Sequence, residues 1–114
     1  MNIKLGSDLV YIPAFEKALK ANKEHFVETA FYPEEIEYAK VQRLASIFAA
    51  KEAAIKALGI LPGKWLEIKI LYEENGKPYI AKFPNGKKSS SKWKHELSIS
   101  HDGEYMLANV IFYK

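Results

Sequence analysis

Two carboxylates and two lysines are the strongest candidates for chemistry in this sequence. Glu52 and Lys56 are four residues apart, Lys51 immediately precedes Glu52, and Asp8 follows Gly6 near the start of the chain. Carboxylates beside lysines suit a magnesium ion that holds phosphates, because Mg²⁺ prefers oxygen ligands and takes one or two carboxylates together with water and substrate phosphate. An ordinary i,i+4 ion pair explains Glu52 and Lys56 equally simply, and residue types alone slightly favour this second interpretation.

Several other kinds of site can be set aside. The sequence contains neither GxxxxGK[ST] nor GxGxxG, so a P-loop or a dinucleotide fingerprint is not indicated. Cysteine is absent and the three histidines are scattered, which excludes disulfides, thiolate metal sites and a thiol nucleophile. A hydrolytic triad would pair Ser98 or Ser100 with His101, but Ser100 and His101 are adjacent, and adjacent strand residues point to opposite faces. The Ser100–His101 pair therefore stays only as a candidate binding element.

The helix predicted from about Arg43 to Gly59 must position Lys51, Glu52 and Lys56. Alanine is frequent in it, Gly59 provides a C-terminal stop, and Pro62 lies just beyond. Lys51 falls inside an apolar stripe, where an unpaired charge is costly, so it needs a partner. We therefore expect this helix to form one wall of a charged site. The stripe consists of Leu44, Ile47, Phe48, Ile55 and Leu58.

Asp8 belongs to a predicted strand over residues 3–12. Alternation puts Ile3, Leu5, Leu9 and Tyr11 on one face, and Gly6, Asp8, Val10 and Ile12 on the other. An aspartate within a strand is more often a bulge or strand-end residue than a ligand. Gly6 would leave space beside it.

The remaining pattern predicts an α+β fold in which the long helix packs on an antiparallel sheet. Helices are expected over 13–22 and from Pro33 to about Lys40, while 25–32 fits either a short helix or a loop. Strands are expected over 65–73, 78–83, 95–101 and 104–113, with a hairpin turn at Asn75–Gly76. The segment 84–94 is expected to be a mobile basic loop.

Length and composition limit the possible classes. A chain of 114 residues fits one domain, here 1–114, and its 48% hydrophobic content is enough for a core. No apolar run spans a membrane and no signal-peptide pattern is present, so a cytoplasmic protein is expected. Six lysines and no acids fall between Lys77 and His95. A solvated face explains them more simply than attraction to phosphates or to an acidic protein.

Four segments, in this order, resemble the holo-acyl-carrier-protein synthase family of 4′-phosphopantetheinyl transferases. Residues 48–59, FAAKEAAIKALG, are similar to the family's second motif almost residue for residue, and this is the most specific match. Residues 6–10, GSDLV, resemble the N-terminal Gly-x-Asp motif, which is weak alone. Residues 76–78, GKP, and 97–101, LSISH, resemble later segments. The resemblance covers most of the chain and implies the 4′-phosphopantetheinyl transferase fold.

The resemblance implies a reaction in which a serine of apo acyl carrier protein attacks the β-phosphate of coenzyme A. Phosphopantetheine moves to the serine, 3′,5′-ADP leaves, and the product serves fatty acid biosynthesis. By the same resemblance Asp8 and Glu52 bind Mg²⁺. Glu52 is the candidate base, directly or through water, and Lys56 faces the phosphates. The residues implied in coenzyme A binding are Lys51, Lys56, Gly59, Ser100 and His101.

The chain departs from the family pattern in two places. Family members often carry an arginine after the first motif, where this chain has Pro13 and Ala14, so carrier docking is expected to fall to Lys17 and Lys20. They also carry one before the second motif's phenylalanine, where this chain has Ile47. Arg43, one turn earlier, could serve partly.

The resemblance also implies a homotrimer with active sites shared between subunits. The last strand has apolar residues on both faces, with Tyr105, Leu107 and Val110 expected on one and Met106, Ala108 and Ile111 on the other. Two alternatives remain open: a non-catalytic relative that binds an acidic protein, and a basic nucleic-acid-binding module suggested by the lysines near Trp93. We expect neither nucleic acid nor membrane as a partner.

Overall fold

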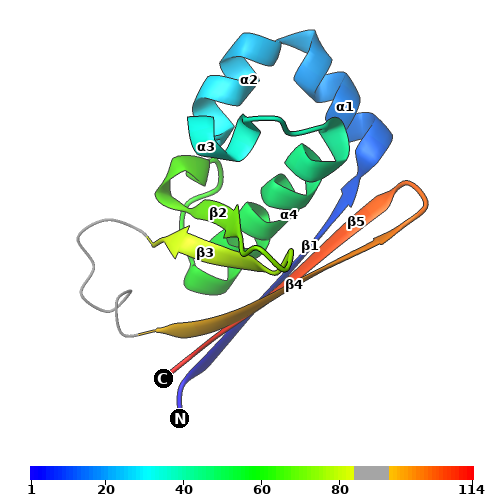
Figure 1. Cartoon of the computed structure of the whole chain (residues 1–114). Coiled ribbons are helices and arrows are strands. Elements are labelled where there is room, and N and C mark those ends of the chain that lie inside the picture. Colours follow the sequence, from blue (N-terminus) through cyan, green and yellow to red (C-terminus); the bar gives the residue numbers. More distant parts are fainter. Residues whose placement is uncertain (84–92) are drawn as a thin grey trace.

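A three-stranded antiparallel sheet with one long helix across it forms the centre of the computed structural model, which describes residues 1–83 and 93–114 (Figure 1). The strands are β1 (Ile3–Tyr11), β4 (Lys94–Asp102) and β5 (Tyr105–Tyr113), in the order β1-β5-β4. The helix is α4 (Val41–Leu58). The predicted α+β class, with a long helix on an antiparallel sheet, is confirmed.

The smaller elements surround α4. Three short helices, α1 (Ile12–Ala21), α2 (Lys23–Ala30) and α3 (Pro33–Ile36), lie around its N-terminal half (Figure 1). A second sheet, the hairpin of β2 (Lys69–Tyr72) and β3 (Pro78–Lys82), follows a short 3₁₀ helix, η1 (Trp65–Glu67). The two chain ends meet at the far end of the main sheet, where Asn2 and Lys114 exchange backbone hydrogen bonds.

Helix α4 is buried on most of its circumference. Small alanines allow this, because Ala45, Ala49, Ala50, Ala53 and Ala54 have no exposed surface and let neighbouring elements approach closely. The helix ends where Gly59 adopts a left-handed conformation, with φ of 68°, and its N–H bonds to the carbonyl of Ile55. The predicted glycine stop is therefore confirmed.

Strand β1 touches the backbone of α4 at Gly6. A Cβ at this position would lie 1.9 Å from the carbonyl oxygen of Ala53 and 3.0 Å from Cβ of Ala57. Only glycine permits this approach without displacing the helix. The space expected beside Asp8 is thus filled by α4, and the contact brings Asp8, two residues along the strand, to the turn of α4 that carries Glu52 and Lys56.

The alternation predicted for β1 is confirmed. Gly6 and Val10 are buried and Asp8 is partly buried beneath α4, whereas the opposite face is exposed to solvent. On β5 the prediction was wrong at two positions. Strict alternation puts buried Val110 with Met106 and Ala108, and Ile111 with Tyr105 and Leu107 on the outer face.

Three other segments differ from expectation. Residues 65–67 form η1 rather than a strand, because the N–H of Ile68 bonds back to the carbonyl of Trp65 and turns the indole toward the helices. The helix from Pro33 ends at Ile36, and Tyr38 follows with a positive φ of 60°. Residues 23–30 are helical, which resolves the ambiguity over 25–32.

The basic loop expected over 84–94 falls mostly outside the described residues. Within the described part of the chain, no helix has both the length and the apolar character needed to cross a membrane.

Candidate active site

Asp8 and Lys56 meet at the junction of β1 and α4. The Lys56 ammonium lies 2.9 Å from Oδ1 of Asp8 and donates a second hydrogen bond, of 3.2 Å, to the carbonyl of Ser7. The Asp8 side chain is only 15% exposed and that of Lys56 is 58% exposed. The carboxylate is therefore held in place, whereas the ammonium can turn toward a ligand in solvent.

Glu52 belongs to the same site. It precedes Lys56 by one turn on α4, and it is half-buried. Burial raises the pKa of the Glu52 carboxyl, and the neighbouring Asp8 carboxylate raises it further, while the Trp65 indole and Lys56 lower it. Lys56, one turn after Glu52, contacts Asp8 directly, so Glu52 and Asp8 lie at the same junction although 44 positions separate them in sequence.

Two carboxylates on a solvent-facing edge fit a Mg²⁺ ion that completes its shell with water and phosphate. A cation between them would also offset the repulsion that raises the pKa of Glu52. Among the described residues no group of three or more His, Asp or Glu side chains could hold a metal ion. Two carboxylates suit an ion that takes its remaining ligands from water and a substrate phosphate.

Lys51 has a different role from the one expected. Its ammonium has no exposed surface and lies 2.7 Å from Oε1 of Glu35 and 2.7 Å from the carbonyl of Ala30. The Glu35 carboxylate also accepts the backbone N–H groups of Tyr32 and Ile70. The prediction that Lys51 contacts coenzyme A is contradicted, because a buried ammonium with two protein partners cannot reach a ligand. The prediction that it needs a buried partner is confirmed.

The buried ion pair joins three elements next to the catalytic candidates. Glu35 comes from α3, Ile70 from β2 and Lys51 from α4, so the pair fixes the α3 helix and the hairpin against the helix that carries Glu52. Burial lowers the pKa of Lys51, and Glu35 opposes that change. The sequence signalled the need for a partner but not its identity.

Three further candidates lie apart from the carboxylates. Gly59 is exposed at the end of α4, and Ser100 is exposed on the outer face of β4. His101 is exposed near the end of β4, where its Nε2 lies 2.8 Å from the carbonyl of Gly103. β5 lies between β4 and β1 in the sheet. The backbone of His101 on β4 is therefore two strand spacings, roughly 10 Å, from the strand that carries Asp8. One chain therefore does not bring Ser100 and His101 to Asp8.

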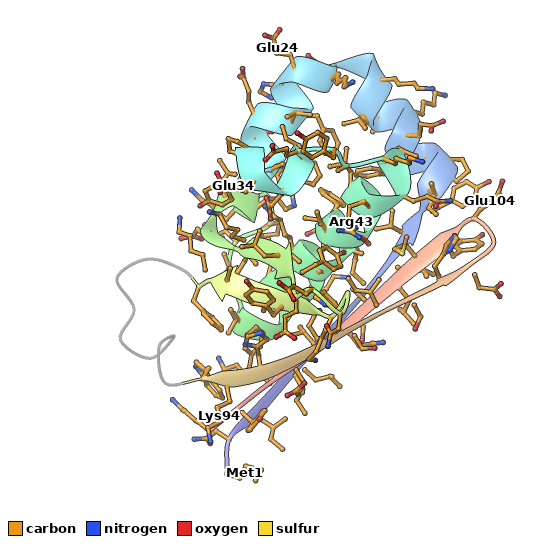
Figure 2. All side chains as sticks on the ribbon, in the orientation of Figure 1. Met1, Glu24, Glu34, Arg43, Lys94 and Glu104 are labelled. Carbon is orange, nitrogen blue, oxygen red and sulfur yellow. The ribbon has the colours of Figure 1, made fainter. Side chains whose placement is uncertain are left out.

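An open cavity of about 860 Å³ lies between α3, the first half of α4 and the β2–β3 hairpin. Glu34 and Arg43, both labelled in Figure 2, line it from α3 and α4. Lys40, Ser46, Tyr72 and Tyr79 also line it. The cavity is not lined by Asp8, Glu52 or Lys56. Nine positions of α4 separate Arg43 from Glu52, so the two side chains lie about 180° apart around the helix axis.

Arg43 gives this cavity a fixed positive group. Its guanidinium lies 3.7 Å from the centre of the Tyr72 ring, a cation–π contact, and Tyr72 in turn bonds to the hydroxyl of Ser46. Ile47, one turn after Arg43, is 2% exposed and serves the core. Arg43 and Lys40, at the start of α4, are therefore the cations that line the cavity from this helix.

The family model of the 4′-phosphopantetheinyl transferase superfamily matches residues 4–110, and the chain belongs to this superfamily of transferase enzymes. A holo-[acyl-carrier-protein] synthase of Ehrlichia ruminantium is 36% identical, over 100% of this chain and 98% of that protein.

Two solved structures are also similar. One is the Helicobacter pylori holo-[acyl-carrier-protein] synthase in complex with coenzyme A, with a TM-score of 0.84 and 34% identity over 96% of this chain and 99% of that one. The other is a Bacillus anthracis holo-(acyl-carrier-protein) synthase in complex with CoA (3′,5′-ADP), with a TM-score of 0.77 and 29% identity over 96% and 94%.

Proposed function

We propose that this chain is a holo-[acyl-carrier-protein] synthase. It transfers 4′-phosphopantetheine from coenzyme A to a serine of apo acyl carrier protein and releases 3′,5′-ADP, with Mg²⁺ as cofactor, for fatty acid biosynthesis in the cytoplasm. The observation that carries the proposal is the meeting of Asp8, Glu52 and Lys56 at the β1–α4 junction, in a chain of this superfamily.

The reaction forms a bond between the serine oxygen and the β-phosphorus of coenzyme A and breaks the bond from that phosphorus to the 3′,5′-ADP oxygen. Asp8 and Glu52 would hold Mg²⁺, which supplies charge neutralisation on the pyrophosphate. Glu52 is the proton acceptor for the serine hydroxyl, directly or through water. Lys56, with its exposed ammonium, stabilises the phosphate charge.

Coenzyme A needs more surface than the carboxylates provide. The cavity beside Arg43 has a suitable size and a positive group for its phosphates, but it lies on the other side of α4. Gly59, Ser100 and His101 remain proposed contacts. We propose that the cavity of one subunit and the carboxylates of another form a single site in a homotrimer.

The outer face of the main sheet supports assembly. α4 covers one face, whereas the other exposes Ile3, Leu5 and Leu9 of β1 by 56, 69 and 60%. Tyr105 and Tyr11 extend this surface, with their rings 5.2 Å apart. Contiguous apolar surface of this kind is uncommon on monomers. Light scattering after size exclusion at micromolar protein should give the mass of three chains, and a mass near one chain would refute the assembly.

Single alanine variants of the three site residues test the proposed roles. Asp8→Ala and Glu52→Ala should each remove most Mg²⁺-dependent transfer to apo carrier protein while the circular dichroism spectrum stays unchanged. Lys56→Ala should lower the rate less, because it removes phosphate neutralisation and not a ligand. Near wild-type rates for folded Asp8→Ala and Glu52→Ala in saturating Mg²⁺ would show that the site assignment is wrong.

A further inference from the structure

The indole N–H of Trp65 is a buried donor that the proposed mechanism does not use. Its Nε1 has almost no exposed surface and no aligned hydrogen-bond acceptor in the part of the chain that the structure describes. An indole nitrogen only donates, and a buried Trp normally finds a partner for it. The acceptor group that lies in front of this N–H is therefore the group that Trp65 can orient.

The Trp65 ring is fixed by aromatic neighbours from two helices. It stacks on Phe26 of α2, with centroids 6.3 Å apart and planes at 8°, and packs against Phe48 of α4 at 5.4 Å. Phe26 and Phe48 are themselves in contact, with centroids 5.6 Å apart. The indole thus has little freedom to rotate away, and the position of its N–H is set by packing.

This packing places the indole over the stripe of α4 that carries Glu52. Phe48 and Glu52 are one turn apart, so a ring packed on Phe48 lies beside the Glu52 side chain. Glu52 is the one acidic residue of α4, and it is half-buried one turn after the phenylalanine on which the indole packs, so its carboxyl is the acceptor that this helix offers to the indole N–H.

We infer that Trp65 is a positioning residue for Glu52: its N–H donates to one carboxylate oxygen and leaves the other turned toward Asp8. The inference rests on the proposed function, in which Glu52 and Asp8 hold Mg²⁺. Groups that hydrogen-bond to a metal-binding carboxylate fix its orientation, and their removal typically costs roughly 10–100-fold in metal affinity or activity. Phenylalanine at this position would keep the stacking and lose the donor.

Trp65→Phe separates the hydrogen bond from the packing. We expect the Mg²⁺ concentration for half-maximal transfer to rise roughly 10–100-fold, with much of the rate recovered at saturating Mg²⁺ and the KM for carrier protein unchanged. The matched control is Trp93→Phe, which removes the other tryptophan, packed near Lys4 and Lys114 at the far end of the sheet. It should leave the Mg²⁺ requirement as in the wild type.

A readout independent of activity uses the same control. In the Trp93→Phe chain Trp65 is the sole tryptophan, so its fluorescence should change as Mg²⁺ is added in the presence of coenzyme A and without carrier protein. The change should disappear in the chain that also carries Glu52→Gln. This titration decides the matter even if Trp65→Phe does not fold.

The outcomes separate the two claims. Wild-type protein without any Mg²⁺-dependent transfer would remove the proposed function. Normal transfer with the same Mg²⁺ requirement in folded Trp65→Phe would overturn only the inference about Trp65, as would Trp65 fluorescence that does not respond to Mg²⁺.

Discussion

Lys51→Met tests how far the buried pair with Glu35 stabilises the fold. The substitution keeps an apolar stem of similar length but leaves a carboxylate without exposed surface, whose remaining donors among the described residues are the backbone N–H groups of Tyr32 and Ile70. It also leaves the carbonyl of Ala30 without the lysine donor. Removing one partner of a buried ion pair costs about 3–5 kcal/mol. At about 4 °C per kcal/mol, the thermal midpoint should fall by about 12–20 °C.

Urea unfolding followed by circular dichroism at one fixed protein concentration measures this effect, because assembly makes stability concentration-dependent. Lys20→Met is the matched control. Lys20 lies 3.5 Å from Glu16 in an exposed pair, and such pairs contribute less than about 1 kcal/mol. A loss below about 1 kcal/mol for Lys51→Met, equal to the control, would refute the view that the pair holds α3 and the hairpin against α4.

Three further outcomes are expected. Gly6→Ala should destabilise the fold by about 1–3 kcal/mol and reduce transfer, because the added Cβ meets the α4 backbone. An unchanged stability to urea together with an unchanged transfer rate would contradict this contact. The His95 ring accepts a hydrogen bond from the backbone N–H of Ile80, and burial lowers the pKa of the ring. Neutral His95 therefore stabilises the fold above its unfolded pKa of about 6.5, and this stabilisation is lost as the pH falls toward the lower folded pKa. His95→Gln, which keeps an acceptor, should flatten the loss of urea stability between about pH 7.5 and 5, and an unaltered profile would argue against it. Lys17→Glu with Lys20→Glu should raise the KM for carrier protein and weaken its salt dependence, with the KM for coenzyme A unchanged; equal effects on both substrates would move the docking surface elsewhere.

Local patterns predicted the parts of the fold that local interactions determine. The period-2 alternation of β1 put Asp8 on the face that α4 covers, and alanine content with Gly59 marked α4 and its end. Helical spacing alone predicts that Glu52 and Lys56 lie on one side of α4, and the family resemblance made them site candidates. Their meeting with Asp8 does not, since it depends on the close approach at Gly6.

The sequence could not predict contacts between distant segments. Glu35 lies in the first turn of α3, and no local pattern marks it as the buried partner of Lys51, sixteen residues away. Trp65 begins an alternating run that is typical of a strand, but residues 65–67 form a 3₁₀ helix whose indole packs against Phe26 and Phe48. In both cases tertiary packing outweighed the local pattern.

Incubating the protein with apo acyl carrier protein, coenzyme A and Mg²⁺ and measuring the intact mass of the carrier is the most direct test of the proposed transferase activity. The carrier should gain one phosphopantetheine group, 3′,5′-ADP should appear in equal amount, and chelating Mg²⁺ or using Glu52→Ala should stop both. A carrier whose reactive serine is replaced by alanine should remain unmodified. An unchanged carrier mass with folded wild-type protein in saturating Mg²⁺, across several apo carriers, would contradict the account.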